Sequence, residues 1–96
     1  DLVIAPHNPI GPLATEVNLH FDASTSNFLV QESRKLTVAE ISSVTKVSEP
    51  IDGYFPLPEG PGLGIDIVEE RFVEFPYKAS FHRGDKVNPD NSIAYI

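Results

Sequence analysis

The chain has 96 residues, and its 14 acidic side chains against 7 Lys and Arg give a formal net charge of −7. That acidic excess excludes a nucleic-acid module that works by neutralising phosphates, and the absence of Cys excludes disulfides, thiolate zinc sites and Cys nucleophiles. The sequence contains no run of about 18 apolar residues, the pattern that would indicate a membrane span. Its hydrophobic content of 41% is enough for a folded core.

The start of the chain reads as a buried strand with no lead-in, and the sequence contains no Met. Native proteins rarely begin inside a strand, so we expect a C-terminal fragment of a longer chain. No basic-plus-apolar signal peptide pattern opens the sequence, and we expect a cytoplasmic location.

The first 32 residues have a strand–helix–strand pattern. Leu2–Ala5 is an apolar run of strand length, and the loop after it holds prolines that bar a helix before about Pro12. A helix is predicted over residues 13–23, because apolar residues recur every four positions on one face. These residues are Leu13, Val17 and Phe21. Phe28–Val30 is the second strand, and the default for this pattern is a parallel pair with a right-handed crossover.

The next part of the chain is polar and weakly patterned over residues 33–48. Thr37 is placed to cap a single helical turn over Val38–Ile41. Further on, the dipeptide Asp52–Gly53 stands between strand-like residues, which indicates a hairpin.

The last third is expected to consist of short pieces. Glu59–Gly64 reads as a tight glycine-rich turn and Ile65–Ile67 as a strand fragment. One or two helical turns are predicted within Val68–Phe75. Residues 77–81 are expected to be extended, and residues 92–96 to form a terminal strand or ordered tail.

His7 and Glu32 are the candidate site residues. His7 follows the first strand and Glu32 ends the second, and the two are 32 − 7 = 25 residues apart. One strand–helix–strand turn of an α/β barrel takes about that many residues and returns the chain to the same level on the neighbouring strand. We therefore expect both side chains at the C-terminal rim, where barrel enzymes hold their active sites. From spacing alone, a loop histidine without a role is an equally open interpretation of His7.

Three sequence blocks then carry a resemblance to a known family. They are Ala5–Pro12 (APHNPIGP), Asn27–Glu32 (NFLVQE) and Pro58–Ile65 (PEGPGLGI), with Asp52–Tyr54 between the last two. Together they resemble the C-terminal part of the enolase superfamily, within it the mandelate racemase subgroup, and most of all its acid-sugar dehydratases of the galactonate and mannonate type. Each block alone is weak, but the three in this order are jointly specific.

The resemblance implies an α/β fold that is the C-terminal part of a (β/α)₈ barrel. Residues 1–32 would be the last strand–helix–strand of the barrel, residues 33–48 a loop with a short helical turn, and residues 49–96 a return segment that packs on a capping region. The rest of the barrel chain would be a partner of this segment, and we expect a homo-oligomer.

The resemblance also implies a reaction and roles for the two site residues. His7 would take the proton α to a substrate carboxylate or act as the acid partner. Glu32 would hydrogen-bond that carboxylate or help to stabilise the enediolate. Such a proton is very weakly acidic, so a neutral imidazole is a usable base only if the developing charge is stabilised, and the implied cofactor is Mg²⁺. Loss of water then gives a 2-keto-3-deoxy acid from an acid sugar.

The metal ligands implied by the resemblance would precede Asp1, so the 96-residue chain alone is expected to bind no Mg²⁺ tightly and to be inactive. Two alternatives remain open: a racemase or epimerase of the same superfamily, and a non-catalytic acidic α+β interaction module. His20 is interpreted as a packed or ion-paired helix residue rather than a ligand, since it shares a helical face with Leu13 and Val17.

Overall fold

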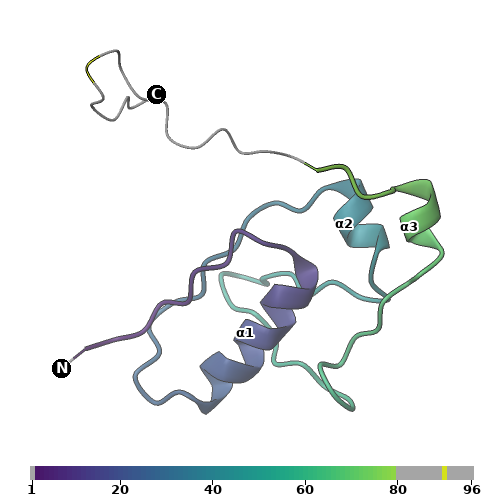
Figure 1. Ribbon diagram of the computed structural model, residues 1–96. Coiled ribbons are helices and arrows are strands. Elements are labelled where there is room, and N and C mark those ends of the chain that lie inside the picture. Colours follow the sequence, from purple (N-terminus) through teal and green to yellow (C-terminus); the bar gives the residue numbers. More distant parts are fainter. Residues whose placement is uncertain (1, 80–89, 91–96) are drawn as a thin grey trace.

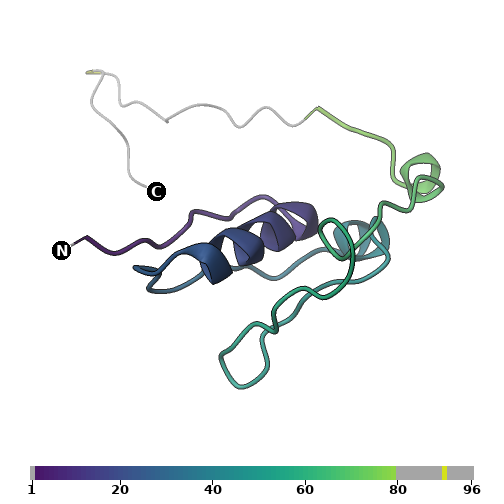
Figure 2. The ribbon, with the colours of Figure 1, turned by 90° about the horizontal axis from the view of Figure 1, so that it is seen from below.

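The computed structural model describes residues 2–79 and 90, and the described part contains three helices. They are α1 (Pro12–Ser24), α2 (Val38–Ser42) and α3 (Arg71–Glu74). Extended pairing within these residues is limited to isolated bridges, which join Ile4 to Phe28 in parallel, and Val44 to Ile67 and Ile51 to Tyr54 in antiparallel fashion. Both views place α2 and α3 at the end of the described part that lies away from residue 2 (Figure 1 and Figure 2).

The predicted parallel pairing of the two strands is confirmed, but it is shorter than predicted. Ile4 donates its N–H to the carbonyl of Asn27 at 2.9 Å, and Leu29 donates to the carbonyl of Ile4 at 2.8 Å. The pairing stops there because the next donor position of the first strand, two residues after Ile4, is Pro6, and proline has no N–H to donate. A two-stranded pair without further neighbours is also only marginally stable.

Side chains continue the parallel register where the main chain cannot. We call residues 2–10 the first segment and residues 27–34 the second segment; Figure 1 shows them running side by side. Three side chains of the second segment donate to carbonyls of the first, each across 25 residues, and we call this set the side-chain ladder. It consists of Asn27 to Leu2 at 3.1 Å, Gln31 to Pro6 at 3.5 Å and Arg34 to Pro9 at 2.7 Å.

Helix α1 begins at Pro12, one residue before the predicted start, and a proline fits the first helical position because that position needs no N–H for the helix. It buries a face that is largely polar. The buried residues are Pro12, Thr15, Glu16, Leu19 and Asp22. Burial raises the pKa of the Asp22 carboxyl, because the charged form loses its hydration.

The face of α1 that carries the periodic apolar residues is exposed. Leu13, Val17 and Phe21 are 40%, 48% and 46% exposed. His20, on the same face, is also exposed and belongs to none of the ion pairs among residues 2–79 and 90, so the interpretation as a packed or ion-paired residue does not hold there. The opposite face turns to the second segment, where Leu19 and Asp22 help to line a cavity of about 510 Å³ with Phe28 and its neighbours.

The short local elements follow their sequence signals. Thr37 caps α2 with a capping box: its hydroxyl accepts from the Glu40 N–H, and the Glu40 carboxylate accepts from the Thr37 N–H.

The predicted hairpin turn is also present. Ile51 and Tyr54 exchange backbone hydrogen bonds of 2.8 and 3.0 Å around Asp52–Gly53. Both turn residues have positive φ, 51° and 84°, which is the geometry of a tight hairpin turn.

The glycine-rich turn is confirmed, and it leads to an antiparallel contact and then to α3. Gly60, Gly62 and Gly64 all have positive φ. After them, Thr45 donates to the Asp66 carbonyl and Val68 to the Ser43 carbonyl, each at 2.9 Å. Helix α3 lies inside the predicted Val68–Phe75 range. The extended stretch predicted over residues 77–81 lies partly outside the described residues, and the terminal strand at 92–96 lies wholly outside them.

Two of the described residues are buried hydrophobic ones, Leu19 and Val44. Many large apolar side chains are exposed instead, and Leu2 at 89% and Leu29 at 62% belong to the two paired segments. Residues on parallel strands are normally covered on both faces, so these segments present apolar surface that further strands or helices would bury. None of the described helices has the length and apolar content to cross a bilayer.

Candidate functional site

The structure brings His7 and Glu32 together as the sequence spacing predicts. His7 Nε2 lies 3.9 Å from Glu32 Oε2. The parallel pairing carries both residues to the same level, since each comes three or four residues after the bridged pair Ile4 and Phe28. Their side chains are 82% and 49% exposed, so both are open to a ligand from solvent.

Asn8 fixes the position of the Glu32 carboxylate, and sequence reasoning missed it. Its backbone N–H donates to Glu32 Oε2 at 2.6 Å, which is the short length typical of a hydrogen bond to a charged acceptor. The Asn8 side chain is 2% exposed and donates from Nδ2 to Thr15 Oγ1 at 2.8 Å. Thr15 Oγ1 in turn donates to the Gly11 carbonyl at 3.1 Å, so the loop of residues 7–10 is tied to the first turn of α1.

Arg34 closes the same loop from the other side. Its Nε donates to the Pro9 carbonyl at 2.7 Å and its Nη2 to the Ile10 carbonyl at 2.6 Å. The guanidinium also forms a bidentate ion pair with Glu40 of α2. Chiefly because Arg34 donates to it, the pKa of the Glu40 carboxyl falls from 4.5 to about 2, although partial burial opposes the change.

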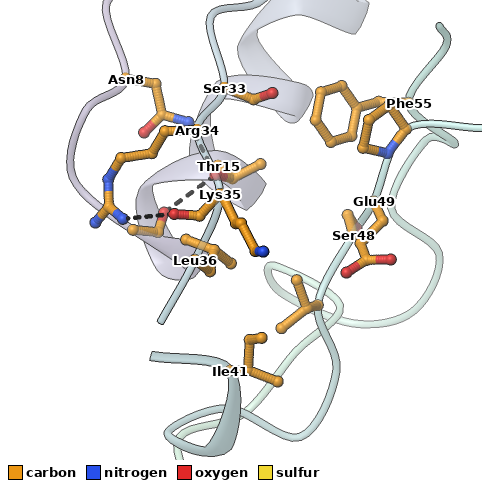
Figure 3. Close-up of a pocket in the computed structure, with 13 residues that line it drawn as sticks. Asn8, Thr15, Ser33, Arg34, Lys35, Leu36, Ile41, Ser48, Glu49 and Phe55 are labelled. Atoms are coloured by element: carbon orange, nitrogen blue, oxygen red, sulfur yellow. Dashed lines mark hydrogen bonds between the residues drawn. The ribbon is translucent and has the colours of Figure 1, made fainter. Parts of the chain in front are cut away.

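A cavity of about 460 Å³ adjoins this loop at Asn8. Figure 3 shows Asn8 and Arg34 on one side of it and Ser48, Glu49 and Phe55 on the other. Neither His7 nor Glu32 lines this cavity, so the pair opens to solvent while the cavity separates the loop from residues 47–50.

The chemistry of the arrangement is that of an imidazole beside a carboxylate. A histidine and an acid within 4 Å can transfer a proton to and from a bound molecule near neutral pH. A metal centre does not fit the described residues: residues 2–79 and 90 include no group of three His, Asp or Glu side chains placed to hold an ion.

The comparisons with known proteins point to one family. A family profile described as enolase C-terminal domain-like matches residues 1–71. Among solved structures, an enolase from Agrobacterium radiobacter provisionally named a galactarate dehydratase is 36% identical, with a TM-score of 0.79, and was bound to sodium and L-malate. The match covers 99% of this chain and 28% of that one.

Two further similar structures differ in their named activity and ligands. A protein from Burkholderia xenovorans provisionally named an L-alanine-DL-glutamate epimerase, bound to magnesium and fumarate, is 33% identical over 80% of this chain and 20% of its own, with a TM-score of 0.75. An enolase from Pantoea ananatis with bound D-gluconate and magnesium is 33% identical over 82% and 20%, with a TM-score of 0.74. The chain thus spans 20–28% of the length of these three structures.

Proposed function

The chain belongs to the enolase C-terminal domain-like family, and from that premise we propose that it forms one side of the active site of a Mg²⁺-dependent acid-sugar dehydratase. The observation that carries the proposal is the placement of His7 and Glu32 side by side, 3.9 Å apart, at the end of a parallel pair. The named activities and ligands of the similar structures support it: a galactarate dehydratase and bound gluconate.

The proposed architecture is the closing part of a (β/α)₈ barrel. Residues 1–32 are the last strand–helix–strand unit, residues 33–48 connect it, and residues 49–96 return to a capping region. The exposed apolar side chains of the two segments, such as Leu2 and Leu29, support the barrel because neighbouring strands would cover them.

In this proposal His7 is the base. It takes the proton from the carbon next to the substrate carboxylate onto Nε2, the nitrogen that faces Glu32. Glu32 shares a proton with the substrate carboxylate or the enediolate in a hydrogen bond, and Asn8 keeps its Oε2 in place. The hydroxyl on the next carbon then leaves as water after protonation, and the enol that remains tautomerises to a 2-keto-3-deoxy acid.

The proposed cofactor is Mg²⁺, which two of the similar structures contain. A divalent cation stabilises negative charge on a carboxylate whose neighbouring carbon loses a proton. Its ligands would come from a part of the protein outside this chain, since the described residues form no such group.

A second candidate function is a racemase or epimerase of the same superfamily. The similarity to the Burkholderia protein named as an epimerase favours it. Both reactions begin with removal of the same α-proton, and they diverge when the enediolate either loses water or takes a proton on its other face.

The test uses the full-length protein that carries this chain, with Mg²⁺ in D₂O and a panel of six-carbon aldonic and aldaric acids. A dehydratase produces a 2-keto-3-deoxy acid, whereas an epimerase places deuterium at the α-carbon with inversion and releases no water. Both activities should vanish with a chelator and return with added Mg²⁺. Neither deuterium exchange nor product with any acid of the panel would overturn the proposal.

A further inference from the structure

Arg34 uses every hydrogen-bond donor that it has. Its five N–H groups make five hydrogen bonds: to the carbonyls of Pro9, Ile10 and Lys35, and to both carboxylate oxygens of Glu40. Two of these acceptors, Pro9 and Ile10, lie in the loop that follows His7. The guanidinium therefore joins three pieces of chain: the loop, its own segment and α2.

The loop of residues 7–10 has few other attachments to the second segment. The last main-chain bond of the parallel pair is at Ile4, and the hydrogen bond from Gln31 to the Pro6 carbonyl is long, at 3.5 Å. Beyond it, the loop is held by the Asn8 N–H on Glu32 and by Arg34 on the next two carbonyls. His7 stands directly before these attachments, and its own exposed side chain has little packing to hold it.

Glu40 keeps the guanidinium in place. Its Oε2 accepts from the backbone N–H of Thr37 at 2.8 Å and from the Thr37 hydroxyl at 2.9 Å, so the carboxylate is fixed to the start of α2 before it meets Arg34. The lowered pKa of Glu40, about 2 instead of 4.5, keeps the carboxylate charged into the acid range as well as at neutral pH. A long arginine side chain loses much rotamer freedom when it is held. Because Glu40 already holds Arg34 in the folded protein, this entropy is not lost again when a ligand binds.

We propose that Arg34, held by Glu40, is a positioning residue that sets the placement of His7 against Glu32 by holding the Pro9 and Ile10 carbonyls. The inference rests on the proposed function for its effect on rate, and on the geometry alone for its effect on the loop. A misplacement of about 1 Å at a reacting group can lower a rate about 10²-fold.

The kinetic test compares three variants of the full-length protein with a matched control. Arg34→Ala and Arg34→Lys should lower kcat about 10- to 100-fold with KM changed less than about threefold. Lysine fails because its single ammonium group lacks the planar fork that reaches two carbonyls and a carboxylate together. The exchange Arg34→Glu with Glu40→Arg restores the ion pair but not the carbonyl contacts, and should be as slow as Arg34→Ala.

Arg71→Ala is the control. Arg71 pairs with Glu74 at 2.7 Å on α3, is more exposed than Arg34, and makes no hydrogen bond to the loop. It should leave kcat unchanged. If the charge exchange restores the rate, or if Arg71→Ala lowers it as much as Arg34→Ala does, the positioning role is overturned.

A measurement without substrate separates this inference from the proposed function. The ring ¹⁵N signals of His7 are recorded by NMR with and without Glu32→Gln, first in the native background and then in Arg34→Ala. We expect Glu32→Gln to shift the His7 signals in the native background and to shift them much less in Arg34→Ala. Equal shifts in both backgrounds would overturn the inference whatever the protein catalyses, whereas a reduced shift in a protein without lyase or epimerase activity would count only against the proposed function.

Discussion

The carboxylate of Glu32 is held by the backbone N–H of Asn8 through a 2.6 Å hydrogen bond to Oε2, the same oxygen that lies 3.9 Å from the His7 imidazole. Oε2 is therefore the Glu32 oxygen that faces the protein. Among residues 2–79 and 90, none donates a hydrogen bond to Oε1, which leaves that oxygen as the one available to a ligand.

His7→Asn in the full-length protein should abolish α-proton exchange with D₂O and product formation together. Asparagine has no proton-accepting ring nitrogen, so the step that begins either reaction is lost. The measurements are deuterium incorporation by NMR and a 2-keto-3-deoxy acid assay. His20→Asn is the matched control, because His20 is an exposed histidine of α1, and it should retain both activities. Turnover of His7→Asn at the native rate would show that His7 is a loop residue without a catalytic role.

Glu32→Gln should be milder than His7→Asn. The amide oxygen can still accept from the Asn8 N–H, so the loop keeps its shape, while the charge beside His7 is removed. Loss of one oriented contact at a reacting centre typically lowers the rate ~10²–10³-fold. Steady-state kinetics test this, with the exposed Glu69→Gln as control. An unchanged kcat would limit Glu32 to holding the loop.

Glu40 should make stability depend on acid pH. Its folded-state pKa of about 2 lies below the ordinary 4.5, so the ionised form is favoured by folding. The contribution of Glu40 is therefore fully present above about pH 4.5 and is lost as the pH falls towards 2. Urea unfolding of the native protein and Glu40→Gln between pH 2 and pH 6 should show a stability difference that shrinks through this window. A difference independent of pH would be the contrary result.

Gly64 and Gly62 form a pair that separates backbone strain from steric clash. Both have positive φ, 78° and 61°, but a Cβ at Gly64 would lie 2.9 Å from the Glu59 carbonyl oxygen, whereas a Cβ at Gly62 meets nothing within 4 Å. Gly62→Ala should lower the free energy of unfolding by about 1 kcal/mol. Gly64→Ala should lower it by about 2 kcal/mol or more, because the turn must also move. Denaturant titration measures both changes. Equal losses of unfolding free energy would mean that the turn adjusts to the added Cβ at Gly64 without cost.

The isolated 96-residue chain should expose apolar surface and self-associate. Side chains such as Leu2, Leu29 and Val17 lie between 48% and 89% exposed, and patches of this kind seldom remain bare in a stable monomer. Increased fluorescence of a hydrophobic dye and early elution from a sizing column would confirm this. A monomer that melts cooperatively and binds no dye would contradict it.

The sequence predicted the elements whose signals are local. Three of them act through neighbours within four residues, so the local sequence alone locates them: the proline at the start of α1, the Thr37 cap and the Asp52–Gly53 turn. The roles of Asn8 and Arg34 were missed for the opposite reason. The contacts that define these roles join residues 24 or 25 positions apart, and Arg34 binds backbone carbonyls there, which every residue has and no residue type reveals.

The burial of α1 shows a second limit of sequence patterns. Periodicity correctly grouped Leu13, Val17 and Phe21 on one side of the helix, but it does not say which side meets the rest of the chain. That depends on where the second segment and the hairpin lie, and the side with Glu16 faces them within the described residues.

The constant offset of the side-chain ladder means that one register holds over the whole length of the second segment. Asn27, Gln31 and Arg34 each reach a carbonyl 25 positions earlier, so an insertion or deletion of a single residue between Asn27 and Glu32 would put the donors beyond it out of register with their acceptors. Such a change would also shift Glu32 past His7. Changes of length should therefore be tolerated after Arg34 and in the exposed turn before Asn27, but not inside the second segment.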